Sequence, residues 1–124
     1  MNETIEPTEW DNTYFNGKVR SINSIINGKP ATKGEIDPGS YTFPTGSREK
    51  LKTTEGTLYI TIPGETEERT LNKGEDVTIP GDSEFKIRVE GETAKYECIY
   101  LDKELTEVDD EISAAGDKIT GTLN

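Results

Sequence analysis

The sequence predicts a single all-β domain, a small β-barrel or sandwich built from short strands. Apolar and polar residues alternate over short stretches, and turn residues separate these stretches at intervals of about 8 to 12 residues. Hydrophobic residues make up only 30% of the chain and charged residues 31%, which suits strands that each bury one face. A chain of 124 residues is long enough for one hydrophobic core and too short for two.

The expected strands follow one another along the chain, each bounded by Gly, Pro, Asn or Asp. A strand pair opens the domain between Tyr14 and Ile26, with a turn at Asn16-Gly17, and Asn27-Gly28 with Pro30 close it. The remaining strands are expected at 33–36, 40–45, 49–54, 56–63, 76–79, 84–90 and 94–101. Residues 64–69 are expected to form a charged loop. Roughly eight or nine strands result.

The net charge of −11 is concentrated at the two ends of the chain. Residues 1–13 carry −4, residues 102–124 carry −5 and residues 14–101 only −2. We therefore expect a mobile acidic tail at 1–13, a domain at 14–101, and a second acidic tail at 102–124 that is disordered or weakly helical over 105–115. Such acidity argues against binding of a nucleic-acid backbone, whereas the nearly neutral centre can hold one phosphate.

The sequence favours a cytoplasmic location. No apolar run is long enough to span a membrane, and the first residues lack the basic and apolar regions of a signal peptide. Cys98 is the single cysteine, so it has no partner for an internal disulfide. Because it stands between tyrosines on a strand, we expect an inert buried thiol.

The chain contains no histidine, so a transition-metal site built from imidazole ligands is excluded. Carboxylates such as Glu49 and Glu84 remain chemically able to bind a hard cation. A metal-free pocket without a cofactor is the expectation that we retain.

Several motifs occur in a specific order between Tyr14 and Leu101. They are YFNGKVRSI at 14–22, YTF at 41–43, Glu49, PGDSEF at 80–85, and the alternating residues Tyr96, Cys98 and Tyr100. In this order and spacing they resemble the pyrimidine/purine nucleoside phosphorylases, which are small single-domain bacterial cupins. The chain departs from that family at Asp82, where members carry His, and at Ile99, where members carry Arg.

The resemblance implies a cupin fold, which is a double-stranded β-helix or jelly roll, and a metal-independent reaction. In that reaction inorganic phosphate attacks the anomeric carbon of a nucleoside and releases the free base and pentose 1-phosphate. Purine and pyrimidine nucleosides are both accepted by the family. Stacking on aromatic side chains would explain this breadth, because every base has a π-face.

The turn after the strand expected at 76–79 supplies the expected catalytic residues Asp82, Ser83 and Glu84. Ser83 and the turn amides are candidates to donate hydrogen bonds to phosphate; the alternative is that Ser83 only caps the turn. Glu84 is expected to hold the sugar hydroxyls or to act as a base, although a Glu after a turn is usually just solvated.

The expected substrate-binding residues come from several strands. Alternation points five aromatic residues inward, as a stacking surface or as plain core: Tyr41, Phe43, Phe85, Tyr96 and Tyr100. Glu49 is a candidate for the sugar hydroxyls, with pairing to Arg48 or Lys50 as the alternative. Arg48 and Arg88 match phosphate best, but alternation points Arg88 outward.

Two other functions remain open from the sequence. A cupin without the family's His at position 82 could bind a nucleoside or nucleotide without turning it over. A purely structural oligomer would neither bind nor react. Because strand edges tend to be covered, we expect a homodimer.

Overall fold

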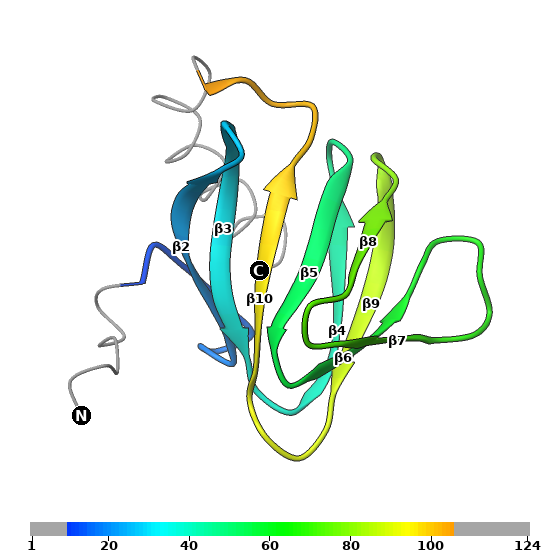
Figure 1. Ribbon diagram of the computed structural model, residues 1–124. Helices are drawn as coiled ribbons and strands as arrows, with labels where there is room; N and C mark the ends of the chain where they lie inside the picture. The colour runs from blue at the N-terminus through cyan, green and yellow to red at the C-terminus, as the bar shows by residue number, and fades with distance from the viewer. Residues whose placement is uncertain (1–9, 106–124) are drawn as a thin grey trace.

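The computed structural model describes residues 10–105 (Figure 1). The strands in this range form two antiparallel β-sheets, and none of the described elements is a helix. No helix in this range is long and apolar enough to cross a membrane. Ten strands are present: β1 (Asn12–Tyr14), β2 (Val19–Ile26), β3 (Lys29–Ile36), β4 (Gly39–Thr45), β5 (Glu49–Glu55), β6 (Thr57–Thr61), β7 (Arg69–Asn72), β8 (Asp76–Ile79), β9 (Ser83–Val89) and β10 (Ala94–Tyr100).

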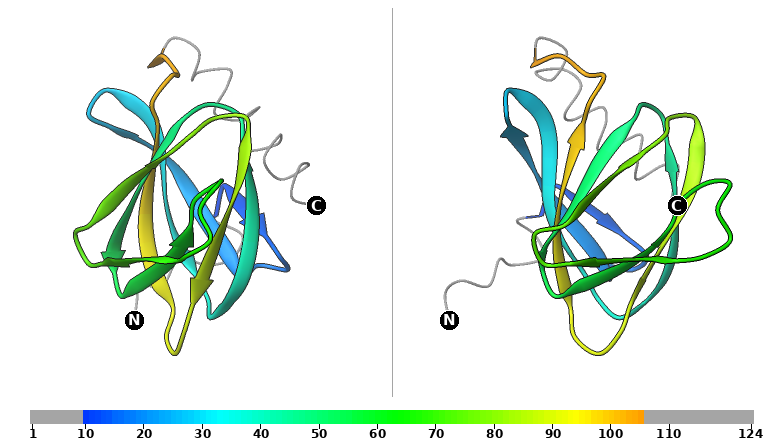
Figure 2. Two further views of the ribbon diagram at one scale, coloured as in Figure 1. Left: turned by 90° about the vertical axis from the view of Figure 1, so that its right-hand side faces the viewer. Right: turned by 45° about the vertical axis from the view of Figure 1, so that its right-hand side comes forward.

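The larger sheet has the order β1-β2-β3-β10-β5-β8, and the smaller has the order β4-β9-β6-β7. The two sheets lie face to face, with the β2–β3 hairpin and β10 on one side and β4 with β9 on the other (Figure 2). They share no hydrogen-bonded strand pair among the described strands, so the molecule is an open two-sheet jelly roll rather than a closed barrel. The all-β, cupin-like prediction is confirmed.

The core lies between the two sheets and follows the strand alternation that the sequence predicts. In β9, Phe85, Ile87 and Val89 are buried while the residues between them are exposed or half-buried. The largest fully buried apolar side chains come from both sheets: Val19, Ile36, Leu51, Leu58, Ile60 and Ile79. Burying one face of each strand therefore builds the core from a sequence that is only 30% hydrophobic.

The β2–β3 hairpin is longer than the sequence indicated. Asn27 and Gly28 both have positive φ, 53° and 75°, as a two-residue type I′ turn requires. This turn pairs Ile26 with Lys29, and the ladder continues from there to Val19 and Ile36. The expected strand at 33–36 therefore begins at Lys29, and Pro30 lies inside it rather than closing the hairpin.

Two further strands lie where we expected a tail or loop. β1, the first strand of the expected opening pair, begins at Asn12, within the expected tail. Asn12 is buried, and its amide nitrogen donates hydrogen bonds to Ser21 and Asn23. β7 pairs with β6 after the charged loop. The expectations for residues 1–9 and for the weak helix beyond residue 105 lie outside the described residues.

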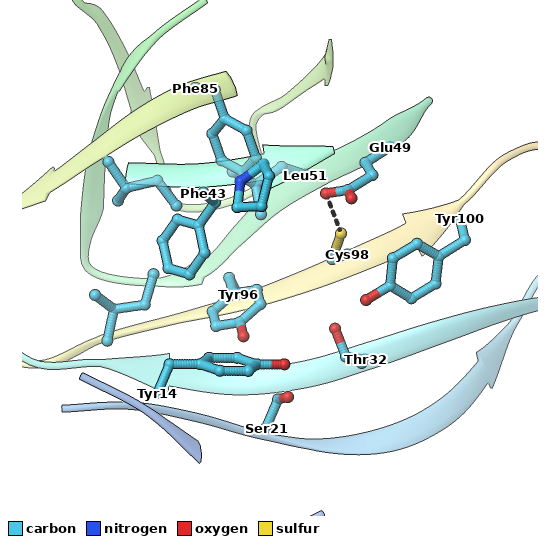
Figure 3. A pocket seen from close by; sticks show the side chains of 13 residues that line it. Tyr14, Ser21, Thr32, Phe43, Glu49, Leu51, Phe85, Tyr96, Cys98 and Tyr100 are labelled. Carbon is cyan, nitrogen blue, oxygen red and sulfur yellow. Dashed lines mark hydrogen bonds between the residues drawn. The ribbon is translucent and has the colours of Figure 1, made fainter. Parts of the chain in front are cut away.

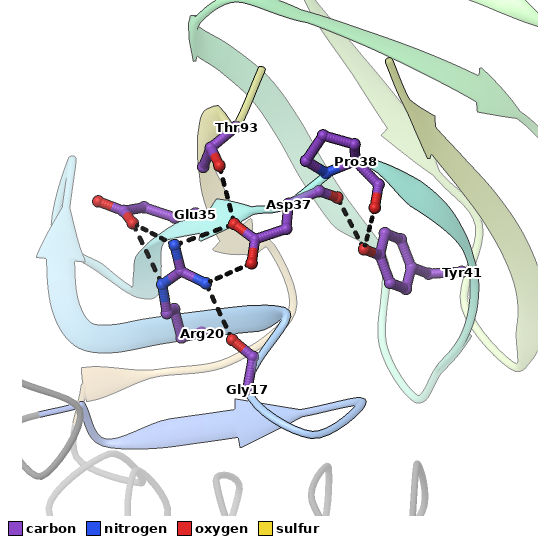
Figure 4. Close-up of polar contacts among 7 residues, drawn as sticks. All are labelled: Gly17, Arg20, Glu35, Asp37, Pro38, Tyr41 and Thr93. Atoms are coloured by element: carbon purple, nitrogen blue, oxygen red, sulfur yellow. Dashed lines mark hydrogen bonds and ion pairs between the residues drawn. The ribbon is translucent and has the colours of Figure 1, made fainter. Parts of the chain in front are cut away.

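An ion-pair network holds the turn between β3 and β4 against the neighbouring strands (Figure 4). The guanidinium of Arg20 on β2 donates hydrogen bonds to Glu35, to both carboxylate oxygens of Asp37 and to the carbonyl of Gly17. Thr93 donates a further bond of 2.8 Å to Asp37. The Arg20 guanidinium is the main cause that lowers the pKa of Asp37 below its ordinary value. The network thus joins β2, β3 and the segment before β10.

Replacing Arg20 by methionine is expected to lower the free energy of unfolding at neutral pH by about 1–2 kcal/mol, because partly buried carboxylates lose charged donors. Since the pKa of Asp37 is lowered in the folded state, this contribution is present above the ordinary carboxyl pKa and is lost as pH falls through the folded value. Urea unfolding at pH 7 and pH 3 measures it. Arg69→Met, in an exposed pair with Glu65, should leave the free energy of unfolding nearly unchanged, because solvent screens the pair. Equal effects of the two variants would contradict the prediction.

Candidate functional site

A small cavity of about 50 Å³ lies between the two sheets and has both polar and aromatic walls (Figure 3). The larger sheet contributes seven polar or titratable side chains: Tyr14, Ser21, Thr32, Glu49, Tyr96, Cys98 and Tyr100. The apolar walls are Ile36, Phe43, Pro44, Leu51, Phe85 and Ile87. Phe43, Pro44 and Tyr100 are half-buried whereas Tyr14, Ser21 and Ile36 are buried, so the mouth lies beside the first three.

The hydroxyl groups of the cavity come from adjacent strands at matching positions. Gly34 on β3 is paired with Ser21 on one side and with Tyr96 on the other. An added Cβ at Gly34 would lie 2.7 Å from the Tyr96 hydroxyl and 2.8 Å from the Cβ of Ser21. Glycine at this position therefore lets the Tyr96 ring lie across β3 with its hydroxyl near Ser21.

The aromatic wall belongs to the smaller sheet. Phe43 on β4 and Phe85 on β9 are directly paired, and their rings stack at 5.6 Å with an interplanar angle of 25°. Tyr14 and Phe15 contact Phe43 edge-on at 6.3 and 5.6 Å, which fixes its position. Because Phe43 remains half-buried, part of its ring faces the mouth.

Glu49 is the carboxyl group in this cavity, and it is only 9% exposed. The thiol of Cys98 donates a hydrogen bond of 3.3 Å to its Oε1. Burial raises the pKa of Glu49 from 4.5 to about 7, and the bond from Cys98 lowers it in part. Burial, followed by the charge of Glu49, raises the pKa of the Cys98 thiol as well. The thiol is therefore a hydrogen-bond donor and not a nucleophile at neutral pH.

Three phenol groups in the cavity stay protonated. Burial is the main cause that raises the pKa of Tyr14, Tyr96 and Tyr100. Among the residues that line the cavity there is no lysine or arginine, and the chain has no histidine. The site therefore offers neutral donors and one carboxyl group, in contact with an aromatic surface.

Five of the residues predicted from the sequence meet in this cavity: Phe43, Glu49, Phe85, Tyr96 and Tyr100. Glu49 makes its hydrogen bond to Cys98 and not to Arg48 or Lys50, so the alternative of a strand-edge ion pair is wrong. Lys50 is paired with Asp76 on the opposite face of β5.

The turn residues Asp82, Ser83 and Glu84 do not line the cavity. The amide of Asp82 donates to the carbonyl of Gly46, and the amide of Ser83 donates to the hydroxyl of Thr45. The Ser83 hydroxyl donates to the Gly81 carbonyl at 2.7 Å, so Ser83 caps its own turn. Asp82 and Glu84 are exposed. These two amides and the Ser83 hydroxyl are thus already used within the protein.

The two arginines also lie away from the cavity. Arg48 pairs with Asp102 at 2.8 Å on the surface. Arg88 faces outward, as alternation predicts, and its guanidinium stacks over Tyr59 at 4.4 Å and pairs with Glu68 and Glu90. The structure therefore does not bring the expected phosphate cations to the cavity.

Tyr41 is buried but does not reach the cavity either. Its hydroxyl donates to the carbonyls of Asp37 and Pro38, which fixes the turn into β4. Tyr41 is therefore a core residue, the alternative that the sequence left open for inward aromatics.

The sequence analysis missed four of the polar lining residues. Tyr14 lies in YFNGKVRSI, the first motif of the family resemblance, and this was the available signal. Ser21 lies in the same motif, whereas Thr32 gave no sequence signal, because small hydroxyl residues on strands are common. Cys98 is buried as predicted, but its contact with Glu49 requires the pairing of β10 with β5. Among residues 10–105, no three His, Cys, Asp or Glu side chains gather as a metal site.

Comparison with known proteins gives a consistent family assignment. The profile of the pyrimidine/purine nucleoside phosphorylase family matches residues 10–100. A protein named pyrimidine/purine nucleoside phosphorylase from Shewanella halifaxensis is 40% identical over 72% of this chain and 95% of its own length. One of the same name from Pseudomonas putida is 41% identical over 73% of this chain and 96% of its own length.

Solved structures share the fold. A protein of unknown function from Vibrio parahaemolyticus superimposes with a TM-score of 0.67 and 32% identity, over 72% of this chain and 94% of that one. A second protein of unknown function, from Acinetobacter, gives a TM-score of 0.67 and 30% identity, over 72% and 87%. From the profile match and the identity of its relatives, this chain belongs to the pyrimidine/purine nucleoside phosphorylase family.

Proposed function

We propose that the protein catalyses phosphorolysis of nucleosides, giving the free base and pentose 1-phosphate, with inorganic phosphate as co-substrate and no metal or cofactor. The observation that carries the proposal is a single cavity that joins hydroxyl groups and a carboxyl group to a stacked aromatic pair. A nucleoside has the same two parts, because its pentose is rich in hydroxyls and its base is a flat π-system. The family name of the relatives supports the same reaction.

The polar wall suits the pentose. Thr32 and Tyr100 face the cavity, and the described residues include no hydrogen-bond partner for either hydroxyl (Figure 3). A ligand hydroxyl would satisfy these groups, and a site built in this way rejects ligands that lack the hydroxyl. The aromatic wall accepts any base, because stacking does not depend on base identity.

The size of the cavity limits how the substrate enters. At about 50 Å³ the enclosed part has room for roughly three or four water molecules, and ligand pockets for whole drug-sized molecules are several times larger. We therefore place the hydroxyl side of the pentose and the phosphate oxygens against the enclosed polar end, and the rest of the substrate, with the base beside Phe43, at the mouth. Phenol and threonine hydroxyls would donate to the phosphate oxygens in place of cations.

The test is incubation of the purified protein with uridine or adenosine, with and without inorganic phosphate, followed by chromatography of the free base. We expect base release that requires phosphate. Thr32→Val and Tyr100→Phe should each lower kcat/KM by roughly tenfold to a hundredfold, because each removes one hydroxyl at nearly constant shape. Tyr59→Phe removes a phenol hydroxyl on the outer face, below Arg88, and should leave the rate unchanged.

The non-catalytic alternative predicts a different result in the same assay. A binding module would show calorimetric binding of uridine or adenosine without release of base, whatever the phosphate concentration. The absence of both binding and release would overturn the proposal and favour a structural role. The homodimer and the cytoplasmic location stay predictions, to be checked by light scattering and by fractionation of cells.

A further inference from the structure

We propose, on the basis of the function proposed above, that Glu49 is the proton relay of the reaction, protonating the departing base and recovering the proton from phosphate. In Figure 3 the Glu49 carboxyl lies above the Cys98 thiol, on the same side of the cavity as Tyr100, while the Phe43 and Phe85 rings line the other side. The carboxyl therefore lines the same cavity as the aromatic pair that would take the base and the hydroxyls that would take the pentose.

The chemical step balances with phosphate as the only other reactant. An oxygen of hydrogen phosphate forms a bond to the anomeric carbon while the bond from that carbon to the base nitrogen breaks. The electron pair of the broken bond goes to the base, which takes the proton of the Glu49 carboxyl. The proton of hydrogen phosphate then passes to the Glu49 carboxylate. The products are pentose 1-phosphate and the neutral base, and Glu49 returns to its starting state.

The surroundings of Glu49 keep its proton available at neutral pH. Glu49 is 9% exposed, and its carboxyl accepts a hydrogen bond of 3.3 Å from a neutral thiol. The titratable groups that face the cavity with it are Tyr14 on β1 and Tyr96, Cys98 and Tyr100 on β10, all neutral at this pH. No cation stands among the lining residues to stabilise the carboxylate. A buried carboxyl in such a site is a general acid poised near pH 7.

The same arrangement explains how an anionic co-substrate enters a site that holds a carboxyl group. An ionised Glu49 would repel phosphate strongly, because charges interact over longer range in a buried, weakly polar cavity than in water. A protonated Glu49 carries no charge and donates a hydrogen bond instead. Phosphate binding and proton donation therefore require the same protonation state of Glu49.

The experiment compares two substrates whose bases differ in their need for a proton. Guanosine requires protonation of its leaving base, whereas the base of 7-methylguanosine already carries a positive charge and leaves without it. In Glu49→Gln we expect kcat for guanosine to fall by roughly 10²- to 10⁴-fold and kcat for 7-methylguanosine by less than about tenfold. Glu97→Gln, with its side chain on the opposite face of β10, is the matched control and should affect neither substrate.

The possible outcomes separate the relay from the function on which it rests. Equal losses for both substrates in Glu49→Gln would overturn the relay and leave the phosphorylase proposal intact. If the wild-type protein releases base from neither substrate, the proposed function fails, and the relay fails with it. Circular dichroism of Glu49→Gln shows whether a lost rate reflects lost folding.

A second variant tests the proton relay through the pH dependence of the guanosine rate. This pH dependence would not change if Glu49 had only a structural role. The thiol of Cys98 lowers the pKa of Glu49 through its hydrogen bond, so Cys98→Ala should raise that pKa. At saturating phosphate, we expect the decline of kcat for guanosine at alkaline pH to move to higher pH in Cys98→Ala, with kcat for 7-methylguanosine showing no such shift. An unchanged pH profile for guanosine would overturn the relay.

Discussion

Replacing Gly34 by alanine should lower the free energy of unfolding by about 3 kcal/mol and reduce nucleoside turnover. A Cβ at this position would lie 2.3 Å from the backbone carbonyl oxygen of Arg20, which the β2–β3 pairing holds in place. It would also lie 2.7 Å from the Tyr96 hydroxyl. The strand must shift to relieve the first contact, and Tyr96 must move in the cavity to relieve the second.

Thermal unfolding of the Gly34→Ala variant measures this loss of stability, and we expect Tm to fall by roughly 10–20 °C. Lys33→Ala is the matched control, because Lys33 is exposed on the same strand and points to the opposite face. In the double variant Gly34→Ala/Tyr96→Phe the contact with the hydroxyl is removed but the contact with the backbone remains. Only part of the stability should therefore return. A single variant with wild-type Tm would show that β3 and β2 can separate without cost.

Glu49 is expected to make the protein less stable as pH rises from 5 to 8. Its pKa is raised from 4.5 to about 7 by burial in the folded state, so the folded protein binds the proton more tightly than the unfolded chain does. Stability therefore decreases between these two values and stays constant above the higher one. The shift corresponds to a loss of about 3 kcal/mol by pH 8.

The measurement is urea unfolding of the wild type and Glu49→Gln at pH 5, 7 and 8. Glutamine does not ionise, so its free energy of unfolding should lack this loss, and at pH 8 the variant should be the more stable of the two. The difference between the proteins isolates Glu49, because all other titrating groups are shared. A constant difference across this range would mean that Glu49 is ionised in the folded protein and would weaken its assignment as an acid.

Local sequence patterns predicted most of the strands correctly, because alternation depends only on residues next to one another. The strands at 76–79, 84–90 and 94–101 match β8, β9 and β10 within one residue at each end. The turn at Asn16-Gly17 predicted the pairing of β1 with β2, but only the last residue of β1, Tyr14, lay within the expected strand pair. β7 has four residues and carries too little alternation to be recognised. β3 was shortened because Pro30 looked like a turn residue.

The candidate site was only partly predictable, because its residues come from seven strands. Alternation placed Phe43, Phe85 and Tyr96 inward, and this holds. Alternation gave no means of deciding whether the polar site lies at the turn 81–84 or in the interior between the two sheets. That choice depends on the turn at 46–48 packing against 80–82: the Gly46 carbonyl accepts from the Asp82 amide, and a Cβ on Gly81 would lie 2.9 Å from that carbonyl oxygen.

The sequence by itself determined the all-β class, the inward face of each long strand, the lack of imidazole ligands and the family resemblance. These features depend on residue type and on a period of two, both of which are local. Only the tertiary structure decided that Glu49 meets Cys98, that Arg48 and Arg88 are held in surface ion pairs, and that Ser83 caps its turn. Each of these depends on pairing between segments far apart in the chain, and the burial that raises the pKa of Glu49 exists only once the two sheets have packed.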